Sequence, residues 1–133
     1  MNPPVPRVLF GVRLAVAALW LFEGLWLKVI AEDTHELKIV QTATQAFHLP
    51  GLQTMVGIGL GETVLAVAVA SGLWAKALAW LQAAVLLLLN LLGILLGGGE
   101  IGSPISLLVH NLPTFACLAI LATCGAGSWR RER

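Results

Sequence analysis

Four apolar stretches, separated by short polar or glycine-rich segments, occupy most of this 133-residue chain. Each has about 20 residues or more, the length that a helix needs to cross the hydrocarbon core of a bilayer. Apolar side chains make up 58% of the residues, too many for a soluble domain of this size to bury. The sequence therefore predicts an all-α integral membrane four-helix bundle in a single domain, with spans at about residues 8–30, 52–73, 77–96 and 104–124.

A more polar segment lies between the first and second predicted spans. Asp33 or Thr34 can cap a helix there, and Glu36 follows Asp33 at the spacing of a capping box. Apolar residues then recur at helical spacing until Pro50. This pattern predicts a short amphipathic helix at about residues 34–48, lying at the membrane surface.

The basic residues are distributed unevenly between the two sides of such a bundle. Six of the eight fall on the side that carries both termini: Arg7, Arg13, Lys76, Arg130, Arg131 and Arg133. Because cytoplasmic segments are enriched in Lys and Arg, both termini are predicted to be cytoplasmic. We expect Arg13 and Lys28 to extend to the headgroups on opposite sides, and residues 129–133 to form a basic interfacial anchor. The net charge of +1 gives no reason to expect nucleic acid as a partner.

The first span carries a carboxylate, Glu23, between Trp20 and Trp26. A charge inside the bilayer is costly and usually marks a functional position. Lys28 is five residues from Glu23, whereas side chains meet on an α-helix when they are three or four residues apart. The partner of Glu23 is therefore expected on another helix, unless its carboxyl group carries a proton.

Each of the other three spans also contains polar side chains. With a rise of about 1.5 Å per residue, Glu23 lies roughly 6 Å from the centre of its span, toward the outer face. Asn90, His110 and Asn111 fall in the same half of the membrane, and Glu62 falls close to the midplane. The shared depth predicts an outward-opening, ligand-binding pocket lined by Trp20, Glu23, Trp26, Glu62, Asn90, His110 and Asn111.

The same polar residues also have a purely structural interpretation. Glu23 and Glu62 could hydrogen-bond across helices, and Asn90 could join two helices in the same way. One histidine and two glutamates on three helices match a metal site poorly, and one intramembrane histidine is a poor basis for haem, so neither is expected. Gly57 and Gly61 have the spacing that lets another backbone approach closely.

Three short motifs resemble those of the DoxX-like family of small four-helix membrane proteins. They are Trp20-x-x-Glu23-Gly24-x-x-x-Lys28, Gly61-Glu62, and Ser103-Pro104 followed by Asn111. The resemblance implies a protein of the bacterial inner membrane, with functional polar positions in the first two spans. The namesake of the family is similar to a subunit of a thiosulfate:quinone oxidoreductase, which makes a quinone or a lipid-like molecule the expected ligand. The chain has no conventional redox motif, and we assign it no reaction.

Two other functions compete with a binding protein for membrane redox chemistry. A non-catalytic subunit could anchor a larger complex, in which case a second copy of the chain or a membrane redox complex would be the partner besides the lipid bilayer. Half of a proton-coupled transporter is a weaker alternative, because four spans are few and the sequence shows no inverted repeat.

Overall fold

The computed structural model describes residues 6–127, and nearly all of them are helical. The elements in order are α1 (Pro6–Leu21), η1 (Phe22–Ile30), α2 (Thr34–Gln45), α3 (Gly51–Ser71), α4 (Ala75–Leu96), η2 (Gly98–Ile101) and α5 (Pro104–Cys124). α1 and η1 form one continuous span, and this span, α3, α4 and α5 are long and apolar enough to cross a membrane. The predicted all-α fold, with four long apolar helices and a short helix between the first two, is confirmed. The predicted anchor at residues 129–133 lies outside the described residues.

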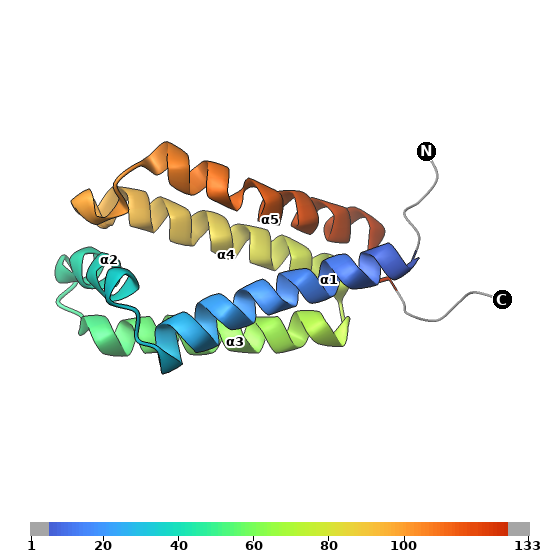
Figure 1. The fold of residues 1–133 in the computed structure, drawn as a ribbon, viewed down its shortest axis with the longest axis horizontal. Helices are drawn as coiled ribbons and strands as arrows, with labels where there is room; N and C mark the ends of the chain where they lie inside the picture. Colours follow the sequence, from blue (N-terminus) through green and yellow to red (C-terminus); the bar gives the residue numbers. More distant parts are fainter. Residues whose placement is uncertain (1–5, 128–133) are drawn as a thin grey trace.

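The long helices form two pairs, as Figure 1 shows. The span formed by α1 and η1 packs along α3, and α4 packs along α5. The two pairs meet at the end of the bundle near the termini and separate toward the opposite end, where α2 lies between them (Figure 1). α2 contacts α3, α4 and η2, so it closes the end of the bundle instead of lying apart from it.

The apolar core occupies the part of the bundle where the two pairs meet. It contains Val16, Ala17 and Trp20 from α1, Ala66 and Val69 from α3, Ala79 from α4, and Leu118 and Leu121 from α5. All four spans contribute, so this core fixes how the pairs cross. The end near α2 has no comparable cluster of buried apolar residues among those described, and it is there that the polar side chains collect.

Arg13 differs from its prediction, because its side chain does not extend to the headgroups. It is only 8% exposed, and its Nη1 donates a hydrogen bond of 3.1 Å to the carbonyl oxygen of Ala126. Its guanidinium carbon lies 5.0 Å from the centre of the Phe10 ring. The chain just after α5 offers carbonyl oxygens that have no partner within the helix, which explains why the charge turns inward.

Of the two cap residues that the sequence offers for α2, Asp33 and Thr34, the structure uses Asp33. Asp33 Oδ1 accepts hydrogen bonds of 3.0 Å from the backbone N–H groups of His35 and Glu36. Replacing Asp33 with alanine should remove about 1 kcal/mol of local stability and speed amide hydrogen exchange in the first turn of α2. Asp33→Asn keeps the accepting oxygen and should exchange like the wild type. Equal exchange in both variants would show that the cap does not hold the helix.

Candidate functional site

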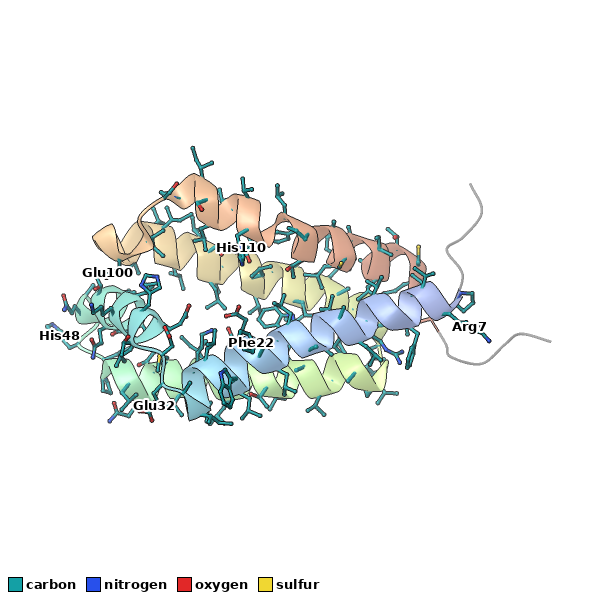
Figure 2. The ribbon with its side chains drawn as sticks, viewed as in Figure 1. Arg7, Phe22, Glu32, His48, Glu100 and His110 are labelled. Atoms are coloured by element: carbon teal, nitrogen blue, oxygen red, sulfur yellow. The ribbon has the colours of Figure 1, made fainter. Side chains whose placement is uncertain are left out.

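A cavity of about 710 Å³ lies in the half of the bundle next to α2, with a mostly apolar wall to which every helix contributes. Six of the seven predicted pocket residues line it: Trp20, Glu23, Glu62, Asn90, His110 and Asn111. In Figure 2, His110 lies on the side of α5 that faces the other helix pair. Trp26 does not line the cavity, and its side chain is 53% exposed on the outer surface of the bundle.

The first span changes its helical geometry where these polar residues begin. From Phe22 to Ile30 it is a π-helix, in which hydrogen bonds join residues five apart instead of four. The bond from the N–H of Ala31 to the oxygen of Trp26, at 2.7 Å, continues this pattern. Glu23 and Lys28 are five residues apart, so the π-helix places them on one face. The prediction that they do not pair is wrong because it assumed α-helical spacing throughout.

Lys28 is the centre of the polar cluster. Its Nζ lies 3.1 Å from Glu62 Oε2, 3.6 Å from Glu36 Oε2 and 3.9 Å from Glu23 Oε2. It also donates a hydrogen bond of 3.4 Å to the backbone oxygen of Glu23. The residue is 7% exposed, so the prediction that Lys28 reaches the outer headgroups is also wrong. One ammonium group thus joins η1, α2 and α3.

Two glycines allow the close crossing that brings Lys28 to Glu62. A Cβ atom on Gly24 would lie 2.6 Å from Glu62 Cβ and 2.7 Å from the oxygen of Gly59. One on Gly59 would lie 2.6 Å from the oxygen of Gly24. Side chains cannot approach this closely, so only glycine fits at both positions. Gly57 and Gly61 lie on the exposed side of α3, where an added Cβ would meet nothing within 4 Å, and they take no part in this crossing.

On the opposite wall, α4 and α5 are joined by a pair of amides. Asn111 Nδ2 donates a hydrogen bond of 2.9 Å to Asn90 Oδ1. Asn90 is 5% exposed, and its own Nδ2 is buried without a hydrogen-bond partner among the described residues. A buried donor of this kind is costly unless it finds an acceptor. Because Asn90 lines the cavity, an acceptor atom of a bound molecule could satisfy it.

Trp20 separates the cavity from the apolar core. Its indole Nε1 donates a hydrogen bond of 2.9 Å to Gln82 Oε1, and Gln82 Nε2 donates back to the oxygen of Leu78 at the same distance. Trp20 and Gln82 are both buried, and Trp20 belongs both to the cavity wall and to the core. Trp20, held by this hydrogen bond, therefore closes the cavity on the side of the apolar core.

Sequence reasoning missed two members of the charged cluster, Lys28 and Glu36. Lys28 lies near the end of an apolar span, where an extended, snorkelling side chain is the usual expectation. Glu36 belongs to the first turn of α2, where a carboxylate is favoured by the helix dipole and needs no other explanation. Only the position of α2 across the end of the bundle shows that Glu36 lines the cavity. The sequence signals available were Gly24, a small residue that permits a close helix crossing, and the position of Lys28 in the same motif as Glu23.

Within residues 6–127, no three His, Cys, Asp or Glu side chains are grouped so as to hold a metal ion. The three glutamates of the cluster lie around an ammonium group instead. The polar groups in the cavity wall include the carboxylates of the cluster, the amides of α4 and α5, and the imidazoles of His35 and His110.

Comparison of the chain with curated proteins gives no match, and comparison with solved structures gives none either. A protein-family comparison does give a match, which covers residues 17–119 and has the description "DoxX-like family". The matched range contains η1, the whole charged cluster, both amides and the glycines of the close crossing. It covers most of the chain and confirms the resemblance drawn from the short motifs. The protein is therefore a multi-span membrane protein that belongs to the DoxX-like family.

Proposed function

We propose that the protein binds a small amphiphilic molecule, of the quinone or lipid-like type, in the cavity beside α2 and in support of membrane redox chemistry. The cavity carries the proposal, since its volume of about 710 Å³ falls within the roughly 300–1,000 Å³ typical of small-molecule sites. Its apolar walls suit a hydrocarbon tail, and the polar residues suit a head with oxygen atoms.

The polar groups divide into donors and proton-exchanging groups. Asn90 Nδ2 has no partner among the described residues, and His110 on the neighbouring helix lines the same cavity; both can donate to a carbonyl oxygen. Glu23 has a side chain that is 37% exposed, so its carboxyl group can exchange a proton with a bound molecule. Glu62, buried against Lys28, would hold that ammonium group in place. The proposal concerns binding and proton exchange and assigns no electron-carrying group to this chain.

We also propose that both termini face the cytoplasm of a bacterial cell, as the distribution of basic residues indicates. With that orientation, α2 and the cavity lie at the outer side of the inner membrane. A ligand would then enter from that side or laterally from the bilayer.

A thermal-shift measurement on the purified protein tests the proposal. A decyl-chain benzoquinone and monoacylglycerol should be added separately, and at least one should raise the melting temperature of the wild type. Asn90→Leu removes the unpartnered donor and should weaken binding about tenfold, since a hydrogen bond contributes roughly 1 kcal/mol or slightly more. Thr123→Val also removes a polar group from a membrane helix, but outside the cavity, and it should respond like the wild type. No shift of the wild type with either compound would refute the proposal.

A non-catalytic subunit remains the alternative, and one observation favours it. Gly57 and Gly61 leave an open, small-residue strip on the outer side of α3, which is the kind of surface on which another membrane helix can pack. Purification as a stable, monodisperse bundle without any partner would count against this alternative.

A further inference from the structure

The cavity wall contains more glutamate side chains than lysine or arginine side chains. Three carboxylates surround the single ammonium group of Lys28, at distances from 3.1 to 3.9 Å. No other lysine or arginine among residues 6–127 lines the cavity; the remaining titratable groups in its wall are His35 and His110. With all three carboxyl groups ionised, the single ammonium group balances only one of them, so the cluster carries a surplus of negative charge.

Lys28 is already engaged with groups of the protein. An ammonium group has three donors, and Lys28 Nζ lies within 3.6 Å of Glu62, of Glu36 and of the backbone oxygen of Glu23. The residue is buried. An anionic head would therefore meet the carboxylates, and the one lysine nearby is buried among them.

The carboxylates differ in how far they are exposed. The side chain of Glu62 is 5% exposed, whereas those of Glu23 and Glu36 are 37% and 29% exposed. Glu23 and Glu36 thus supply the accessible negative charge, one from η1 and one from α2. Repulsion between like charges is stronger at a partly buried site than in bulk water.

A second feature of the cavity points independently to the kind of head that it accepts. Asn90 Nδ2 is a buried donor without a partner among the described residues, and Asn90 lines the same cavity. This amide requires an acceptor oxygen but carries no charge that would favour an anion. An uncharged carbonyl or hydroxyl oxygen satisfies Asn90 without repulsion from the glutamates.

We infer that the cavity selects amphiphiles with an uncharged, oxygen-bearing head, and that Glu23 and Glu36 are the specificity-determining residues that exclude anionic heads. The inference rests on the proposed function and narrows its ligand class. Fatty acids and anionic phospholipids are excluded, and neutral carbonyl or hydroxyl compounds are accepted.

The test compares two ligands that share one tail and differ only in head charge: dodecanamide and dodecanoate. Binding is measured by tryptophan fluorescence of the protein in nanodiscs of neutral lipid at pH 7.5. The wild type should bind the amide at least about tenfold more tightly than the carboxylate. In the double variant Glu23→Gln/Glu36→Gln, the ratio of the two affinities should fall by about tenfold or more.

Glu100→Gln is the matched control. It removes one carboxylate at the same end of the bundle, as Figure 2 shows, but Glu100 does not line the cavity. Its affinity ratio should equal that of the wild type. Each glutamine variant must remain monodisperse and helical for its affinities to be compared. If the double variant does not fold, the ratio of the two affinities in the wild type still tests whether the cavity excludes anionic heads.

The outcomes separate this inference from the proposed function. If the wild type binds both ligands equally well and Asn90→Leu weakens both, the cavity is a binding site but the charge selection is wrong. An unchanged ratio in the double variant would show that Glu23 and Glu36 do not determine it. If neither dodecyl ligand binds, and neither the quinone nor monoacylglycerol raises the melting temperature, the proposed function itself fails.

Discussion

Replacing Lys28 with methionine should destabilise the folded protein by about 3–5 kcal/mol, the usual cost of removing one partner from a buried ion pair. Methionine keeps the length and apolar stem of the side chain, so the loss isolates the charge. Glu62 would be left buried without its counter-ion, 5% exposed, and close to two further carboxylates. Unfolding in mild detergent, followed by circular dichroism against temperature or denaturant, measures the effect.

Two further variants show whether the charge cluster is the cause. Lys38→Met removes an exposed lysine from α2 and should change stability by less than about 0.5 kcal/mol. Adding Glu62→Gln to Lys28→Met removes the buried charge that lost its partner and should restore part of the stability. If Lys28→Met is as stable as Lys38→Met, the cluster does not hold η1, α2 and α3 together.

Gly24→Ala should be strongly disruptive for a change that adds a single methyl group. The added Cβ would lie 2.6 Å from Glu62 Cβ and 2.7 Å from the backbone oxygen of Gly59, and the backbone oxygen cannot move without moving α3. We expect a loss of about 1–3 kcal/mol, typical of overpacking a tight contact, together with a longer distance between Lys28 and Glu62. Gly59→Ala should behave similarly, because the crossing is close from both sides.

Two other glycines of α3, the helix that carries Gly59, provide the control for this prediction. Gly57→Ala and Gly61→Ala each add the same methyl group to α3, but the new Cβ would meet nothing within 4 Å. Both should be neutral or slightly stabilising, because alanine is the better helix former by roughly 1 kcal/mol. Equal effects at all four positions would mean that helix propensity, not the crossing of η1 and α3, explains the result.

Much of the fold follows from the sequence because membrane spans depend on length and hydropathy alone. Four stretches long enough for a bilayer give four helices, and Asp33 marks the start of the short helix between the first two. The depth of the polar residues along their spans was also sufficient to predict that Glu23, Glu62, Asn90 and His110 lie around one cavity. The depth of a residue in the membrane depends only on its position along the helix axis, so it can be estimated by counting residues from the centre of the span.

The parts that could not be predicted depend on rotation and on tertiary contacts. The depth of a residue does not give the direction in which its side chain leaves the helix. Trp20 and Trp26 were therefore both assigned to the pocket, although only Trp20 faces inward. The pairing of Lys28 with Glu23 depends on the π-helix, which no residue pattern in the span announced. The role of Glu36 depends on how α2 packs across the end of the bundle, which local sequence does not determine.

The π-helical stretch has a consequence for how the residues of the first span are assigned to its faces. Successive residues of an α-helix turn by about 100°, and a stretch with wider turns shifts the phase of everything that follows. A single helical wheel drawn through residues 6–30 would therefore place Lys28 on the wrong side relative to Trp20. The first span of this chain is better drawn as two wheels, joined at Phe22, before any position is assigned to the lipid or to the cavity.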